Sequence, residues 1–255
     1  MQLKGKIVFI TGASAGIGEA TAMAFAAEGA RLLLAARRAG KLAEVASKAL
    51  VRGAAAVHSI DLDVRSRHSV QRAIDDLPPD WAEIEVLVNN AGVSRGMEKL
   101  YTGRIEDWEE MIDTNIKGLL YVARAVLPGM VVRRRGHVVN LGSMAGEIVR
   151  PNDVVYCSTK AAARAINDGL REDLLGTPVR VTSIDPGLVE TDFSLVRFHG
   201  DANRAARVYK GMKPLIPKDV ADVILWAVTR PEHVNISRVS LTSVHQANSL
   251  LIHRE

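Results

Sequence analysis

Near its N-terminus this 255-residue chain reads Thr11-Gly12-Ala13-Ser14-Ala15-Gly16-Ile17-Gly18, and this stretch decides the fold. A short apolar run, residues 6–11, leads into it, and apolar residues repeat with helical spacing after it. A glycine turn between a strand and a helix is where a dinucleotide pyrophosphate binds, because glycine lets the backbone approach closely and the helix N-terminus attracts anions. The spacing G-x-x-x-G-x-G departs from the G-x-G-x-x-G fingerprint, so the position of the turn, more than its pattern, predicts a dinucleotide site.

Strands and helices alternate along the rest of the sequence. Short apolar runs predict further strands at residues 31–36, 55–61, 86–89, 137–141, 179–184 and 238–243. Helical spacing predicts helices at residues 41–50, 70–77, 105–131, 154–175 and from Pro217 onward. This alternation predicts one α/β domain over residues 1–255, a doubly wound parallel sheet (Rossmann fold) of about seven strands with helices on both faces. Ligands of such sheets bind beyond the carboxyl ends of the strands.

Composition narrows the classes of function. Hydrophobic residues make up 47% and charged residues 24%, as in ordinary globular proteins. No apolar run reaches the ~20 residues of a bilayer span, the N-terminus lacks a signal-peptide pattern, and the single cysteine, Cys157, cannot form an intramolecular disulfide. The net charge of +4 comes without a basic stripe interleaved with aromatic residues, and the seven histidines lack metal-ligand spacing. We therefore expect a cytoplasmic protein with no membrane, nucleic-acid or metal partner.

The end of the second predicted strand indicates which dinucleotide is bound. An NAD enzyme normally carries an acidic residue there for the ribose 2′-hydroxyl. Here the strand ends in Arg37 and Arg38, whose guanidiniums suit a 2′-phosphate, so NADP(H) is favoured. Asp63, after the third strand, could accept from the adenine amino group or be a turn residue. The stretch Asn89-Asn90-Ala91-Gly92 ends the fourth strand and could line the cofactor cleft or form a turn.

A candidate acid/base pair occurs in Tyr156-Cys157-Ser158-Thr159-Lys160. Tyr156 and Lys160 are four residues apart in a predicted helix and so share a face. A free tyrosine has a pKa of ~10, so a phenol that acts as an acid and base near neutral pH needs its pKa lowered by about three units. This shift corresponds to roughly 4 kcal/mol, which one cation at ~4 Å supplies. Taken alone, such a pair is common on surfaces. Ser143 ends the fifth strand at the same sheet edge, and Asn115, a poor helix former inside a predicted helix, suggests a kink or a water site.

The ordered set of motifs resembles the short-chain dehydrogenase/reductase superfamily along almost the whole chain: the glycine turn, the N-N-A-G stretch, Asn115, Ser143, Tyr156 and Lys160, and Pro186-Gly187 with Thr191. The resemblance implies that Tyr156 is the proton donor or acceptor and that Ser143 polarises the carbonyl. It further implies that Lys160 lowers the pKa of Tyr156 and binds the nicotinamide ribose, and that Asn115 holds a relay water. The implied cofactor contacts are Gly12, Ser14, Gly16, Ile17, Gly18, Arg37, Arg38, Asp63, Val64, Asn89, Ala91, Gly92, Tyr156, Lys160, Pro186, Gly187, Val189 and Thr191.

A closer resemblance, to the NADP-dependent 3-hydroxy acid dehydrogenases that oxidise serine or allo-threonine, lies in DWEEMIDTN (107–115), AVLPGM (125–130), VRFHGD (196–201) and PEHVNI (231–236). That subgroup implies a homotetramer, and it also resembles sulfoacetaldehyde reductases. The segment 147–153 departs from it, so the substrate stays open. An acid substrate would need a buried cation, for which Arg95, Arg150 and Arg197 are the candidates; Arg197 lies in the expected substrate lid, about residues 190–215.

Two other functions remain open on the sequence. The first is a reductase of sulfoacetaldehyde, of bulkier ketones or of 3-oxoacyl compounds, which would use the same residues on a different small molecule. The second is a non-catalytic NADPH-binding regulator, because fold does not fix function. The presence of Asn115, Ser143, Tyr156 and Lys160 together favours an enzyme, since a binding module has no need of a proton donor.

Overall fold

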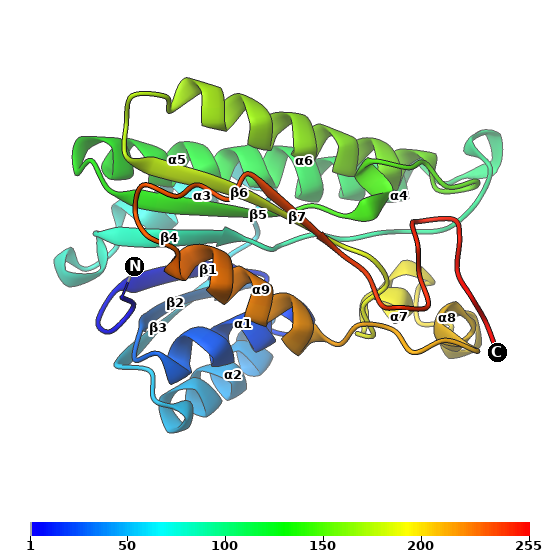
Figure 1. Cartoon of the computed structure of the whole chain (residues 1–255), viewed down its shortest axis with the longest axis horizontal. Helices are drawn as coiled ribbons and strands as arrows, with labels where there is room; N and C mark the ends of the chain where they lie inside the picture. The colour runs from blue at the N-terminus through cyan, green and yellow to red at the C-terminus, as the bar shows by residue number, and fades with distance from the viewer. Residues whose placement is uncertain (1) are drawn as a thin grey trace.

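The computed structural model describes residues 2–255, and its centre is a sheet of seven strands that all run parallel (Figure 1). The strands are β1 (Ile7–Thr11), β2 (Arg31–Ala36), β3 (Ala56–Asp61), β4 (Ile84–Asn89), β5 (Gly136–Leu141), β6 (Val179–Pro186) and β7 (Arg238–Leu241). Their order across the sheet is β3-β2-β1-β4-β5-β6-β7, so the winding reverses between β1 and β4. The predicted doubly wound α/β fold is confirmed, and the reversal marks the edge at which such sheets bind ligands.

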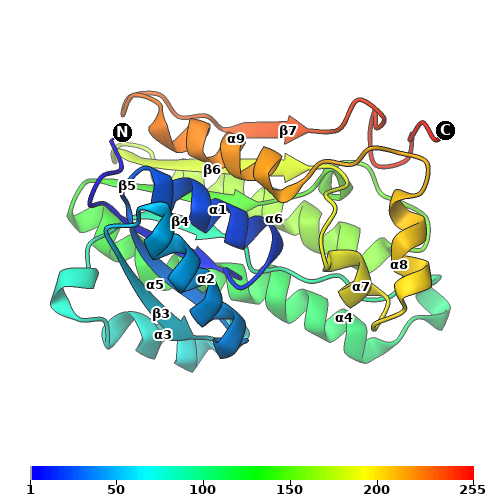
Figure 2. The same cartoon turned by 90° about the horizontal axis from the view of Figure 1, so that it is seen from below.

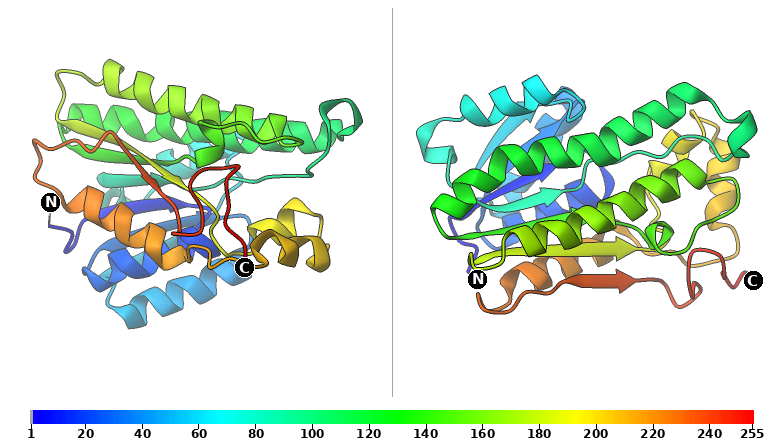
Figure 3. Two further views of the ribbon diagram at one scale, coloured as in Figure 1. Left: turned by 45° about the vertical axis from the view of Figure 1, so that its right-hand side comes forward. Right: turned by 90° about the horizontal axis from the view of Figure 1, so that it is seen from above.

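Helices cover both faces of this sheet (Figures 2 and 3). One layer consists of α1 (Gly16–Ala27), α2 (Ala39–Arg52) and α9 (Pro217–Thr229), and the other of α3 (Arg67–Asp75), α4 (Ile105–Ile112), α5 (Leu119–Val132) and α6 (Val154–Asp173). Successive side chains of β1 alternate between the layers: Val8 and Ile10 pack toward α1 and α9, whereas Ile7 and Phe9 pack toward α3 and α5. Because both faces are covered, β1, β4, β5 and β6 are buried along their length. Of these four strands, only β1 and β4 are mainly apolar, because β5 and β6 also contain buried polar residues.

A π-helical turn, Asp113–Gly118, joins α4 to α5 and contains Asn115. The irregularity that the sequence indicated at this asparagine is therefore present. The continuous helix Ile105–Val132 has the length and apolar composition of a membrane span. However, Val122, Val126 and Met130 within it are buried against the sheet, so it serves here as a core helix.

Two short helices that the sequence analysis did not predict, α7 (Phe193–Arg197) and α8 (Ala202–Tyr209), follow β6. They lie beyond the carboxyl end of the sheet, next to the last residues of the chain (Figure 1). Short 3-10 turns occur at Pro79–Trp81, Leu100–Thr102 and Met144–Gly146. Helices α7 and α8 thus add to the carboxyl end of the sheet.

Candidate active site

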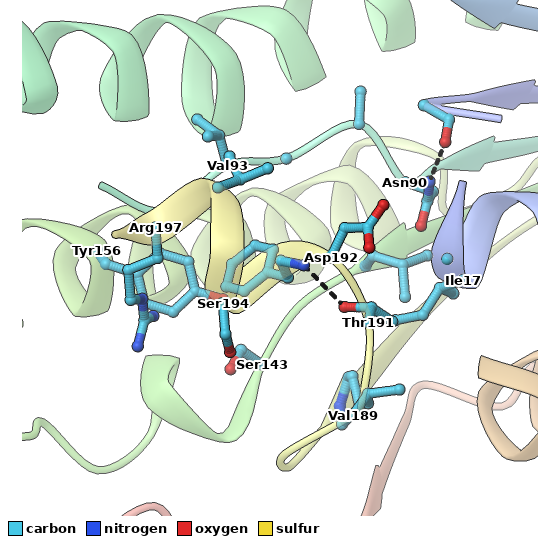
Figure 4. A pocket seen from close by; sticks show the side chains of 18 of the residues that line it. Ile17, Asn90, Val93, Ser143, Tyr156, Val189, Thr191, Asp192, Ser194 and Arg197 are labelled. Atoms are coloured by element: carbon cyan, nitrogen blue, oxygen red, sulfur yellow. Dashed lines mark hydrogen bonds between the residues drawn. The ribbon is translucent and has the colours of Figure 1, made fainter. Parts of the chain in front are cut away.

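A cavity of about 460 Å³ lies at the carboxyl ends of β1 to β6, with α7 and α8 on its outer side. Of the residues predicted to form the site, all line this cavity except Gly18, Asn89 and Asn115. Figure 4 shows Ile17 and Asn90 toward one end and Tyr156 and Arg197 toward the other. We refer to these as the Ile17 end and the Tyr156 end.

The glycine turn at the Ile17 end leaves no room for larger side chains. Gly12 and Gly16 have φ angles of +64° and +56°, in the left-handed region that favours glycine. A Cβ atom on Gly18 would lie 2.3 Å from the carbonyl oxygen of Gly12. Gly18 therefore acts by letting α1 pack against the turn, and Gly12 and Gly16 form the wall itself.

Asn90, rather than the predicted Asn89, reaches the glycine turn from β4. Its Nδ2 atom donates to the carbonyl oxygens of Thr11 (2.9 Å) and Gly12 (3.2 Å), and its backbone N–H donates to Thr11 Oγ1 (3.1 Å). Asn89 instead donates to Asn140 Oδ1 (3.1 Å) inside the sheet. Asn89, the last residue of β4, is thus bonded inside the sheet, whereas Asn90, directly after the strand, lines the cavity.

The carboxyl end of β2 forms the basic part of the cavity. Arg38 donates through Nη2 (3.0 Å) and Nε (3.3 Å) to Ser14 Oγ, which holds its guanidinium beside the glycine turn. Arg37 is half-exposed, and its Nη1 lies 3.8 Å from Glu110 Oε1. Two cations at this end of the cavity fit the 2′-phosphate of an NADP-type dinucleotide.

Asp63 is engaged by a neighbouring arginine on the chain. The Nη2 atom of Arg65 lies 2.6 Å from Asp63 Oδ2, and Arg65 Nε is within 3.0 Å of both carboxylate oxygens. Partial burial works to raise the pKa of this carboxyl, but the hydrogen bonds and charge of Arg65 outweigh it and the pKa is lowered. The carboxylate lines the cavity as an acceptor in its ionised form.

Tyr156 and Lys160 lie one turn apart on α6, and both are buried. Lys160 Nζ donates to the carbonyl oxygen of Leu141 (2.8 Å) at the end of β5 and lies 6.0 Å from the centroid of the Tyr156 ring. Burial lowers the pKa of Lys160 to about 8, against the pull of the Asp185 carboxylate. The lysine is thereby fixed between the end of β5 and the tyrosine.

The phenol of Tyr156 is held in its protonated form by its surroundings. Burial raises its pKa, and the positive charge of Arg197, then a hydrogen bond with Ser143, oppose the rise. Lys160, the cation expected from the sequence, lies 6.0 Å from the ring centroid, and the guanidinium of Arg197 is nearer, at 5.1 Å. Ser143, whose Oγ also accepts from the Ala145 N–H (3.1 Å), lies at the same end of the cavity (Figure 4).

Asn115 lies behind the cavity wall rather than in it. Its Nδ2 donates to the Val93 carbonyl (2.8 Å) and to Thr159 Oγ1 (3.0 Å), and its Oδ1 accepts from the Val93 N–H (2.8 Å). A Cβ on Gly92 would lie 3.4 Å from Asn115 Oδ1 and 3.7 Å from Lys160 Nζ. The Asn115 side chain therefore joins the segment after β4 to α6. The absence of a side chain at Gly92 leaves space between the Asn115 amide and Lys160.

Helix α7 docks on the segment that follows β4. Arg197 Nε donates to Ser94 Oγ (2.8 Å), Arg95 Nη1 donates to the Val196 carbonyl (2.6 Å), and the Gly96 N–H donates to the Arg197 carbonyl (2.9 Å). Arg95 is itself held by Glu110, whose oxygens lie 2.6 and 3.3 Å from its Nε and Nη2. Of the three predicted substrate-binding arginines, Arg95 thus has protein partners on every nitrogen.

The other two predicted arginines meet at one carboxylate. Arg150 forms an ion pair with Asp153 through Nη2, and Arg197 Nη2 lies 3.5 Å from the same Oδ2 atom of Asp153. Asp153 and Arg197 are 4% and 5% exposed, so this charged group is removed from solvent. Both guanidiniums line the cavity at the Tyr156 end.

Several cavity residues have no signal in the sequence pattern. Tyr209 of α8 donates to the Val189 carbonyl (2.8 Å) and pairs with Ser194 Oγ (2.9 Å), which fixes α8 against the chain after β6. Gln246 accepts from the Leu188 N–H (2.8 Å). These contacts join residues far apart in sequence, and no spacing rule relates them.

Comparison with known proteins agrees with this architecture. The sequence profile of the short chain dehydrogenase family matches residues 6–200. The chain is 44% identical over 250 residues to the NADP-dependent 3-hydroxy acid dehydrogenase YdfG of Salmonella typhi, covering 97% of this chain and 99% of that protein. It is 41% identical over 255 residues to the NADP-dependent 3-hydroxy acid dehydrogenase of Schizosaccharomyces pombe, covering 100% and 98%.

Among solved structures, the closed form of serine dehydrogenase complexed with NADP+ is similar with a TM-score of 0.90 at 44% identity, covering 98% of this chain and 100% of that chain. The resemblance that the motifs indicated is therefore confirmed for the family and for the fold. The chain belongs to the short-chain dehydrogenase family.

Proposed function

We propose that this protein is an NADP(H)-dependent oxidoreductase that transfers a hydride between the nicotinamide and a small 3-hydroxy acid or its carbonyl counterpart. The observation that carries the proposal is one cavity that combines a buried phenol, Tyr156, with the guanidiniums of Arg150 and Arg197. A positioned phenol can exchange a proton with a substrate oxygen, and guanidiniums favour a substrate that has an acid group. The names of the two relatives above include this activity.

The cofactor is held, in this proposal, along the wall from the glycine turn to the chain after β6. Gly12 and Gly16 admit the pyrophosphate against the N-terminus of α1, and Arg38 with Arg37 binds the 2′-phosphate. Pro186 to Thr191 would border the nicotinamide, with Val189 and Thr191 near its carboxamide. The nicotinamide supplies or accepts the hydride when bound.

The chain's own residues supply the proton and orient the substrate. Because burial favours the protonated phenol, Tyr156 is ready to donate a proton when a carbonyl is reduced. In the oxidation direction, Arg197 stabilises the phenolate that must accept the proton. Ser143 holds the substrate oxygen, and Lys160 binds the ribose. A relay water on Asn115 would use the second lone pair of Oδ1, because both Nδ2 hydrogens are taken.

We further propose that residues 190–215 act as a substrate lid and that the protein is a cytoplasmic homotetramer. The docking of α7 on residues 94–96 brings Arg197 beside Tyr156 in the cavity wall, which supports the lid. The long helix Ile105–Val132 exposes Ile105, Ile112 and Leu120, and these apolar side chains support association with another copy. The single cysteine is free and buried, as suits a reducing compartment.

Initial rates over a panel of substrates test the proposal. The panel pairs NADP+ and NAD+ with 3-hydroxypropionate, L-serine, isethionate and a bulky secondary alcohol, and uses Tyr156→Phe as the blank. The highest kcat/KM is expected for NADP+ with a small 3-hydroxy acid. A preference for the bulky alcohol, or tight NADPH binding with no turnover of any compound in either direction, would contradict it.

A further inference from the structure

The charged cluster of Arg150, Asp153 and Arg197 has more positive than negative charge. We propose that the two guanidiniums bind the acid group of the substrate and that Asp153, between them, restricts the site to a singly charged anion. This inference rests on the proposed function and identifies the residues that would select the acid. The ligand chemistry is a carboxylate or sulfonate on a short hydroxylated carbon chain.

The charge count of the cluster supports an anion site. Two guanidiniums face one carboxylate, so the cluster as a whole has one uncompensated positive charge. Arg197 and Asp153 are nearly fully buried, and a buried charge without a partner is costly. The carboxylate of a substrate would neutralise the cluster at the moment when the cavity is filled.

Arg197 has hydrogen-bonding capacity to spare for a ligand. Its Nε is used by Ser94 and its Nη2 faces Asp153, but among residues 2–255 no partner is present for Nη1. A carboxylate or sulfonate oxygen can accept a charge-assisted hydrogen bond from this free Nη1.

The position of the cluster fits a 3-hydroxy acid. The guanidinium carbon of Arg197 lies 5.1 Å from the Tyr156 ring centroid and 5.5 Å from that of Phe193. With carbon–carbon bonds of about 1.5 Å, the hydroxyl oxygen and carboxylate carbon of a 3-hydroxy acid are about 4 Å apart. One small molecule can therefore place its hydroxyl at Tyr156 and its acid group at Arg197. Arg95 is excluded from this role because Glu110 and the Val196 carbonyl already occupy it.

Binding of a dead-end acid tests the site without turnover. Calorimetry on the enzyme saturated with NADP+ compares propionate with propanamide, a neutral molecule of the same shape. The unmodified protein is expected to bind propionate at least tenfold more tightly, and Arg197→Met or Arg150→Met should remove most of that preference. Arg207→Met, at an exposed arginine on α8, is the matched control and should leave the preference intact. Equal binding of propionate and propanamide by the unmodified protein would overturn the proposal.

Asp153→Asn separates an anion site from a merely structural cluster. Its side chain makes no hydrogen bond to the N-terminus of α6, so asparagine removes charge without removing a helix cap. The cluster then has two uncompensated positive charges. Propionate should bind several-fold more tightly, and malonate, a dianion, should become a ligand. Weaker propionate binding in a variant with native circular dichroism and NADPH affinity would contradict the proposal.

Two further outcomes keep the inference distinct from the proposed function. Ethanesulfonate in place of propionate distinguishes the head groups: preference for either acid over propanamide supports the site, and the tighter ligand identifies its chemistry. Preference for propionate in a protein that oxidises no hydroxy acid would refute the function and leave the site standing. Turnover of hydroxy acids without any preference for the anion would refute the site and leave the function standing.

Discussion

Arg38 and Arg37 follow each other in sequence, but they are held differently, and their substitution by alanine should have unequal effects. Arg38 is fixed beside the glycine turn by two hydrogen bonds to Ser14 Oγ. Arg37 is half-exposed and faces Glu110 across 3.8 Å. The guanidinium of Arg38 is therefore preorganised for a 2′-phosphate, whereas that of Arg37 has to leave the Glu110 carboxylate before it can reach the phosphate.

The magnitudes follow from these surroundings. A hydrogen bond to a charged group contributes about 1.5–3 kcal/mol, which corresponds to a tenfold to more than hundredfold increase in the KM for NADPH in Arg38→Ala. An exposed ion pair contributes about 0–1 kcal/mol, so Arg37→Ala should change the same constant by about fivefold or less. Neither substitution should alter the KM for NADH, which lacks the phosphate.

Steady-state kinetics with one carbonyl substrate and both cofactors measures these constants. Arg52→Ala, an exposed arginine at the end of α2, serves as the control for a general loss of positive charge. The reasoning is refuted if Arg37→Ala is the more damaging variant, or if Arg38→Ala weakens NADPH and NADH equally.

Three further predictions follow from other contacts. Tyr156→Phe should lose ~10² to 10⁴ in kcat while its Kd for NADPH, measured by fluorescence titration, stays within about twofold; a variant that keeps a tenth of its rate would exclude Tyr156 as the proton donor. Burial, with the charge of Arg180, lowers the pKa of His137 to about 3 in the folded protein, whereas an unfolded histidine titrates near 6.5. The unfolded state therefore gains the proton as pH falls below 6.5, and this one group should reduce the free energy of unfolding by about 2 kcal/mol at pH 5. Urea unfolding at pH 7 and 5 measures the loss, which His137→Gln should lessen; an equal loss in both proteins would contradict the assignment. Arg95→Met should free α7 from residues 94–96, raising the substrate KM more than the NADPH Kd and speeding proteolytic cleavage within residues 190–215, whereas unchanged cleavage would count against the lid.

The sequence predicted the sheet well because the strands recur as short runs rich in apolar residues between turn residues and helical patterns. The predicted limits of β2, residues 31–36, agree with the structure, although β4 begins earlier than predicted, at Ile84. The glycine turn and the ends of β2, β4, β5 and β6 came together as expected, because parallel strands bring their carboxyl ends to one edge. The sequence order of the motifs was therefore enough to predict most of the cavity wall.

Features that depend on tertiary contacts were not visible in the sequence. Helix α7 has five residues, too few to establish a helical period, and α8 has no buried residue to mark an apolar face. Neighbouring asparagines at the end of β4 could not be told apart, since side-chain direction depends on where the strand stops. The meeting of Arg150 and Arg197 at Asp153 depends on how α7 folds back over α6, which no local pattern encodes.

The docking of α7 on residues 94–96 has a consequence for how specificity can change in descendants of this chain. Residues 94–96 come shortly after Asn90 and Gly92 of the cavity wall, yet their partners in α7 lie about a hundred positions later in the sequence. A lid grafted from another family member would meet Ser94 and Arg95 of this chain instead of the segment on which it folds in its own protein. A new substrate range should therefore be acquired through paired substitutions in residues 94–96 and in the lid. In chimaeras that exchange the lid alone, we expect the lid to detach from residues 94–96 and the substrate preference to stay unchanged.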